Sequence, residues 1–201
     1  MLVQFTIFSL MSGAGGLITE RRTRTLLRLL STSVRRAEII AGKMLTMFAV
    51  AVAQQAILIA VGQALFGVPY LQSPLALLLV VLSLGLCVAS LGLLLATLVP
   101  TEQAEVAVSI TAMMAFSALG GAWFPLEAAG PAFNAVGHFF PSAWAMDGLQ
   151  TIILRGLGVG AVLSPVGVPL GYSAGFFALE QFAEGLSRHR ANRTAVLKEP
   201  R

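Results

Sequence analysis

Charged and redox-active residues are scarce in this chain of 201 residues. Only 11% of its residues are charged, and its single cysteine, Cys87, lies inside an apolar run. One thiol excludes a disulfide framework within the chain, and no cysteine spacing is typical of a metal site. We therefore interpret Cys87 as a small buried hydrophobic residue.

Motifs for chemistry are lacking as well. The chain has no G-x-x-x-x-G-K-[ST] phosphate-binding motif, because Gly42-Lys43 has neither the upstream glycine nor the Ser/Thr that binds magnesium. His138, Glu127 and Asp147 fall in one region, but no spacing joins them into a metal or nucleophile site. We predict no catalytic residue, no metal site and no cofactor in this chain.

Apolar residues are abundant instead. They make up 57% of the chain, and the mean hydropathy of +0.84 lies outside the usual range of a soluble domain. A membrane helix needs about 20 mainly apolar residues. The sequence thus predicts an all-α integral membrane protein with one permease-like domain and five spans, Met1–Thr19, Met44–Phe66, Pro74–Val99, Ala104–Phe124 and Leu163–Glu184. Met1–Thr19 lacks the basic start of a secretory signal, which favours a span.

Basic residues concentrate in two segments. Seven of the thirteen Lys and Arg residues lie in residues 20–43, five lie in the tail 185–201, and only Arg155 lies elsewhere. Short loops rich in Lys and Arg face the cytoplasm. Four spans separate the two segments, so both are predicted to be cytoplasmic, while Met1 and residues 67–73 lie outside. This distribution predicts contact with anionic membrane lipids and not with nucleic acid.

Residues 125–162 do not fit a simple loop, because they are apolar and interrupted by proline and glycine. Aromatic residues gather at this region, as they do at membrane interfaces. We predict an outer re-entrant region of short helices, whose backbone needs polar partners in protein or in a water-filled cavity. The residues that mark it are Gly121, Trp123, Pro125, Pro141 and Trp144.

Residues 20–30 show helical amphipathic spacing. Arg21, Arg24 and Arg28 recur along one side, and Leu26, Leu27 and Leu30 occupy roughly the other. Such a helix can rest in the lipid head groups. It can also dock a cytosolic protein and pass force to the membrane helices. The residues alone leave both interpretations open.

These residues carry a resemblance. The segment ERRTRTLLRLL (20–30), followed by VRRAEIIAGK (34–43), resembles the intracellular loop of type-2 permeases of ATP-binding-cassette (ABC) exporters, approximately E-R-x-x-G-T-L-E-x-L-x-x-[TS]-P and then a basic pair and G-K. Residues 120–126 (GGAWFPL) and 141–144 (PSAW) are similar to the outer re-entrant region of that family. The resemblance covers residues 1 to about 184. Arg24, Arg28 and Ser33 depart from the family's glycine, glutamate and proline.

The resemblance implies a coupling helix that docks on a separate ATPase subunit, which supplies ATP and magnesium. Its docking residues would be Glu20, Arg21, Arg24, Thr25, Leu26, Leu27, Arg28 and Leu30. It further implies a second copy of the chain or a related permease as partner, and a bacterial-type inner membrane. The family usually has six spans, so the first helix is expected to be missing here.

Polar and small residues inside the spans are further candidates. Gln54, Gln55 and Gln63 are candidates for a substrate path, and interhelical hydrogen bonding is the alternative. Glu180 and Glu184 lie eight and four residues before Arg188, a spacing typical of a helix end with an ion pair, with a proton relay as the alternative. The glycines Gly167, Gly171 and Gly175 allow close helix approach, which favours packing within the chain over a seam between two copies.

The leading hypothesis is the membrane subunit of an ATP-driven exporter of a hydrophobic or amphiphilic substrate such as a drug, a lipid or a lipid-linked glycan. A non-transporting scaffold or truncated fragment and an ion-coupled transporter are the alternatives. An ion-coupled transporter needs its own intramembrane carboxylate, for which Glu180 and Glu184 are the candidates.

Overall fold

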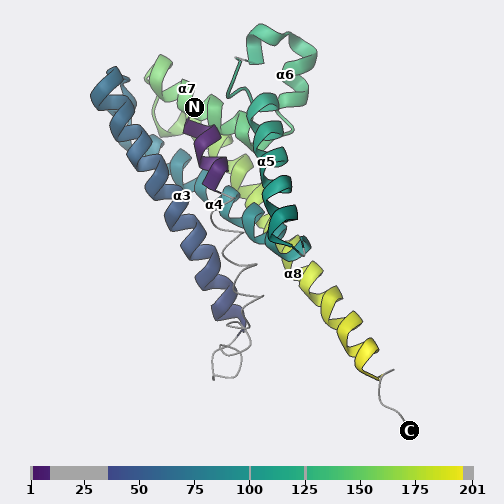
Figure 1. The fold of residues 1–201 in the computed structure, drawn as a ribbon. Helices are drawn as coiled ribbons and strands as arrows, with labels where there is room; N and C mark the ends of the chain where they lie inside the picture. Colours follow the sequence, from purple (N-terminus) through teal and green to yellow (C-terminus); the bar gives the residue numbers. More distant parts are fainter. Residues whose placement is uncertain (1, 10–35, 100, 125, 197–201) are drawn as a thin grey trace.

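The computed structural model describes residues 2–9, 36–99, 101–124 and 126–196, and these residues contain helices and no strand. After helical residues 2–9, the elements are α3 (Arg36–Phe66), η1 (Tyr70–Gln72), α4 (Pro74–Leu98), α5 (Glu102–Leu119), η2 (Leu126–Ala129), α6 (Pro131–Gly137), α7 (Pro141–Arg155), η3 (Val159–Val162) and α8 (Leu163–Val196). Figure 1 shows α6 and α7 together at one end of the long helices. The all-α fold predicted from the sequence is confirmed for this part of the chain.

In the described part of the chain, three helices are long and apolar enough to cross a membrane: Glu38–Phe66, Pro74–Leu98 and Val159–Ala183. The apolar helix Gln103–Leu119 is shorter. Of the first predicted span only residues 2–9 are described, and they are helical. The count of five spans therefore stays a prediction.

The observed helix ends differ from the hydropathy bounds by more than two residues at three places. Helix α3 is described from Arg36, eight residues before the predicted start at Met44, because the helix-forming residues before the apolar run continue the same helix. Helix α8 continues to Val196 beyond the predicted end at Glu184. Hydropathy identifies only the apolar part of a helix and does not detect the polar residues that extend the helix at either end.

Helix α5 ends at Leu119, before the predicted end at Phe124. Gly120 caps the helix, and Gly121 has a φ of +76°, which L side chains rarely adopt. A Cβ at Gly120 would collide with the side chain of Ser142 and the carbonyl of Phe116. The Ser142 hydroxyl donates to that carbonyl at 2.7 Å. The glycine pair thus lets α7 begin directly against the end of α5.

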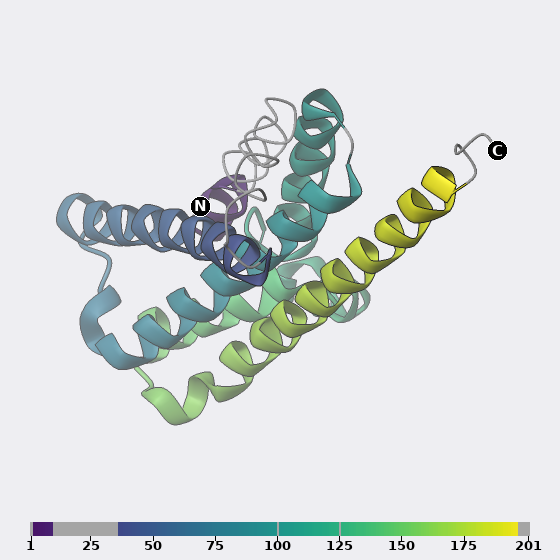
Figure 2. The same cartoon turned by 90° about the horizontal axis from the view of Figure 1, so that it is seen from below.

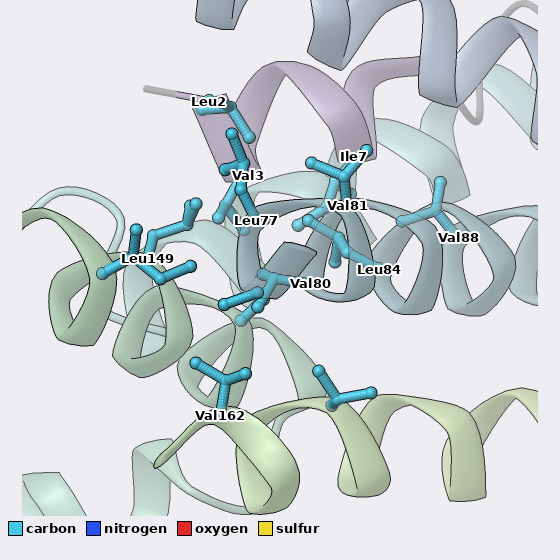
Figure 3. Packing of buried hydrophobic residues seen from close by; sticks show 14 of the residues in the cluster. Leu2, Val3, Ile7, Leu77, Val80, Val81, Leu84, Val88, Leu149 and Val162 are labelled. Atoms are coloured by element: carbon cyan, nitrogen blue, oxygen red, sulfur yellow. The ribbon is translucent and has the colours of Figure 1, made fainter. Parts of the chain in front are cut away.

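Helix α4 is the centre of the bundle. It contacts α3, α7 and α8. In its apolar stretch of 18 residues 78% of the residues are buried, against 17% in the corresponding stretch of α3 and 22% in that of α8. Figure 3 shows side chains of residues 2–9, α4, α7 and η3 meeting around it, among them Val3, Val80, Leu149 and Val162. Helices α3 and α8 expose most of their apolar surface, as helices in contact with lipid do.

The view from below shows α8 running diagonally past the other helices toward the C-terminus (Figure 2). Its first half packs on α4 and α7. The Ser173 hydroxyl donates to the carbonyl of Leu86 in α4 at 3.3 Å. The first half of α8 is thus fixed to the central helix, whereas its last turns extend beyond the bundle.

Candidate functional site

The two adjacent glutamines of α3 hold helices together. Gln54 Nε2 donates to the carbonyl of Phe5 at 2.8 Å, and Gln55 Nε2 donates to the carbonyl of Val81 at 3.3 Å. Gln55 is fully buried, and α3 can approach this closely because α4 has Gly85 there, where a Cβ would lie 3.2 Å from Val52 Cγ2. These contacts fit interhelical hydrogen bonding, the alternative to a substrate path.

Gln63 lies in a different setting. It lines an apolar groove of about 460 Å³ between α3 and α4, next to η1. The other lining residues are apolar, including Ile59, Leu77 and Val81. The Oε1 atom of Gln63 is buried and has no hydrogen-bond partner among the described residues. An amide oxygen buried without a partner costs free energy that a ligand with a donor group can recover.

A histidine and an aspartate connect the short helices α6 and α7. His138 caps α6, and its Nε2 lies 2.8 Å from Asp147 Oδ2 on α7. Its Nδ1 lies 2.8 Å from the carbonyl oxygen of Asn134. Both ring nitrogens therefore face acceptors, and only the protonated imidazolium can donate to both.

The electrostatics agree with this geometry. The hydrogen bond to the Asn134 carbonyl is the largest influence and raises the pKa of His138 above 6.5, and Asp147 raises it further, while partial burial lowers it. Trp144 supports the arrangement, because its Nε1 donates to the His138 carbonyl at 2.9 Å and its ring meets the imidazole edge to face. Sequence reasoning missed this pair, since its members lie nine positions apart, on either side of the break at Pro141.

The residues predicted to mark the re-entrant region have separate structural roles. Gly121 takes the positive φ described above and leaves room for Leu126, whose Cγ would lie 2.8 Å from a Cβ there. Pro141 starts α7, where its missing N–H costs nothing. Trp123 is exposed and Trp144 is half-buried. Pro125 lies outside the described residues.

Beside the histidine pair, α6, α7 and the start of α8 enclose a pocket of about 400 Å³, which we call the α7 pocket. Its polar lining comes from Asn134, His138, Asp147, Gln150, Thr151 and Arg155. The groove at Gln63 and the α7 pocket thus offer contrasting surfaces, one apolar and one polar.

The sequence comparisons cover most of the chain. Residues 1–179 match the profile of the family described as ABC-2 family transporter protein. The chain belongs to the ABC-2 family. The linearmycin resistance permease protein LnrN of Bacillus subtilis (strain 168) is 32% identical over 189 residues, which are 94% of this chain and 48% of that protein. The chain spans about half the length of this curated relative. No solved structure matches this chain significantly.

The family predicted from the sequence is thereby confirmed, and this ABC-2 protein is a multi-pass membrane protein. The predicted docking residues, Glu20 to Leu30, lie outside the described residues. What the structure describes is the helix that follows them, α3, which runs without a break from Arg36 to Phe66. Over 31 residues its length is about 46 Å.

The three glycines of α8 lie in open space among the described residues. Gly167, Gly171 and Gly175 are exposed, and a Cβ at any of them would meet no atom within 4 Å. Close packing of these glycines against other described residues is therefore not seen, and their packing role stays a prediction. The alternative, a seam between two copies, stays a prediction.

Two carboxyl groups lie deep in the described part. Glu105 in α5 and Glu180 in α8 are fully buried, and the Ser109 hydroxyl donates to Glu105 Oε1 at 2.7 Å. Glu180 is thus no exposed helix-end residue, and the side chains of Glu184 and Arg188 lie outside the description. Within the described residues, no group of three His, Cys, Asp or Glu side chains is placed to hold a metal ion.

Proposed function

We propose that this ABC-2 protein is the membrane subunit of an ATP-driven exporter. The observation that carries the proposal is the family match over residues 1–179. Because the chain has no phosphate-binding motif, a separate ATPase subunit supplies ATP and magnesium and docks on residues 20–30. This chain itself catalyses no reaction.

The proposed orientation follows from charge. The basic segment 20–43 and the tail 185–201 face the cytoplasm, and the end with α6 and α7 faces outward from a bacterial-type inner membrane. A second copy or a related permease completes the membrane part, with the exposed glycine face of α8 as a candidate seam. Anionic lipids surround the basic segments.

The proposed substrate is hydrophobic or amphiphilic, in the class of drugs, lipids or lipid-linked glycans. The groove between α3 and α4 supports this class, because its walls are apolar and Gln63 supplies a buried polar atom. The name of the relative LnrN, a resistance permease, agrees with export of a harmful compound. Coupling requires that the ATPase bind two states of the membrane part with different affinity. Helix α3 would link the docking segment to the groove.

Transport into inverted membrane vesicles tests the proposal. The vesicles carry the chain with its native partners, and the probe is a fluorescent dye with one alkyl chain. An ATP-driven exporter accumulates the dye with ATP, continues when a protonophore removes the ion gradient, and stops with vanadate. Replacing the groove amide by Gln63→Leu should lower the uptake severalfold, whereas the exposed Gln181→Leu in α8 serves as the matched control.

The ion-coupled alternative is favoured by one observation, the complete burial of Glu180 in an apolar helix. It predicts that Glu180→Gln abolishes uptake and that the protonophore does the same. An exporter driven by ATP keeps most of its uptake in both cases. Vesicles that show no ATP-dependent uptake with any of several alkyl dyes, although the chain is present and folded, would favour the scaffold alternative.

A further inference from the structure

The α7 pocket is built mainly along one face of α7. Asp147, Thr151 and Arg155 are spaced by four residues, so they lie on neighbouring turns of the same side of the helix. The distance from the first to the last is about 12 Å along the axis. The volume of about 400 Å³ falls in the range of ligand sites, which is roughly 300–1,000 Å³.

The lining of the α7 pocket contains two basic side chains and one acidic side chain. Asp147 is paired with His138 at 2.8 Å, so these two groups neutralise each other when the imidazole is protonated. Arg155 is exposed at the other end, and no hydrogen bond or ion pair joins it to a described residue. Among the described lining residues, the guanidinium is therefore the charge left for a ligand. A guanidinium binds carboxylate and phosphate oxygens through two parallel hydrogen bonds.

Neutral donors and acceptors continue the site beside this charge. Gln150 and Thr151 line the pocket between Arg155 and the histidine pair, and Asn134 lines it from α6. Trp144 adds an aromatic wall, and its orientation is fixed by the hydrogen bond to His138. A ligand with an anionic group and hydroxyl groups would find a partner for its charge in Arg155. Its hydroxyl groups would find hydrogen-bond partners in the neutral polar side chains beside it.

We propose that the α7 pocket binds a phosphate ester with a hydroxylated head group, with Arg155 as its anchor. Two sources share this chemistry, the head group of an anionic phospholipid and a free phosphate ester. The proposal does not require transport, and it can be tested without an ATPase, so its failure and the failure of the exporter proposal are separate.

The test uses the fluorescence of Trp144 in the purified full chain in dodecyl maltoside. The chain has two tryptophans, so Trp123→Phe leaves Trp144 as the only reporter. The probes are dihexanoyl phosphatidylglycerol, glycerol 3-phosphate and the zwitterionic dihexanoyl phosphatidylcholine. We expect saturable binding of phosphatidylglycerol that exceeds binding of phosphatidylcholine. Binding of glycerol 3-phosphate as well would identify a free ester as sufficient, and its absence would identify the lipid head group.

Three variants decide the role of the charges. Arg155→Gln should weaken binding about tenfold or more, because a charge-assisted hydrogen-bond pair is lost. Lys43→Gln removes one positive charge from a residue that does not line the pocket, so it should leave the affinity that Trp144 reports unchanged. Asp147→Asn should bind the anion as well as before or more tightly. Equal affinity in Arg155→Gln, loss of binding in Asp147→Asn with retention in Arg155→Gln, or no binding of either anionic probe would overturn the proposal.

Discussion

At the scale of single residues, proximity in space decides function where spacing in sequence does not. His138 and Asp147 were visible in the sequence as two titratable residues of one region, but only the fold of α6 against α7 brings them to 2.8 Å. Conversely, Gln54 and Gln55 were predicted as one set with Gln63, and the structure separates them. Two of them reach carbonyls of neighbouring helices, and one lines a groove. The sequence could identify these residues as candidates for a functional or structural role, but it could not predict which groups they contact.

The histidine pair predicts a pH-dependent stability. Because the folded-state pKa of His138 is raised above 6.5, its contribution is fully present below about pH 6.5 and is lost as the pH rises through the folded-state value. Both side chains are partly exposed, so the ion pair is worth about 0.2–1 kcal/mol. We expect the thermal unfolding midpoint in detergent to fall by about 1–3 °C between pH 6 and pH 8.5.

The matched variant is Asp147→Asn, which keeps the shape of the side chain and removes its charge. It should reduce this fall and lower the midpoint at pH 6 more than at pH 8.5. A midpoint difference that stays the same at both pH values would mean that the pair does not titrate in this range.

At the scale of elements, the sequence predicts helix ends well where proline marks them. Helix α4 was expected from Pro74 to Val99 and is observed from Pro74 to Leu98. The early end of α5 depends on the backbone conformation of Gly121 and on the close approach of Ser142, neither of which hydropathy measures. The glycine ladder of α8 has the same limit, since a four-residue period defines a face of the helix without defining its neighbour.

Two glycines with different surroundings give a direct comparison. Gly120→Ala should lower the free energy of unfolding by about 1–3 kcal/mol, because the added methyl group collides with Ser142 and with the Phe116 carbonyl. Gly171→Ala, in open space, should leave it almost unchanged. Thermal unfolding of the purified variants followed by size-exclusion chromatography measures both. An equal effect of the two substitutions would contradict the packing of α5 against α7.

At the scale of the whole molecule, the distribution of burial is the main finding. A central α4, with α3 and α8 exposing apolar surface on either side, is the arrangement of a membrane protein whose outer helices meet lipid. Composition alone predicts the membrane class, because 57% apolar residues exclude an ordinary soluble domain. Which helix is central could not be predicted, since α3 and α4 both contain an apolar run long enough to cross a membrane.

The central proposal is that this ABC-2 chain is driven by a separate ATPase docked on residues 20–30. The most direct measurement is a tagged pull-down from gently solubilised native membranes, comparing the unmodified chain with Leu26→Asp. Leu197→Asp, which adds the same charge to the tail, is the control. The account predicts that an ATPase with a phosphate-binding motif is recovered in stoichiometric amount with the unmodified and Leu197→Asp chains and is lost with Leu26→Asp. If no ATPase is recovered with the unmodified chain under conditions that preserve a known exporter complex, the proposal is contradicted.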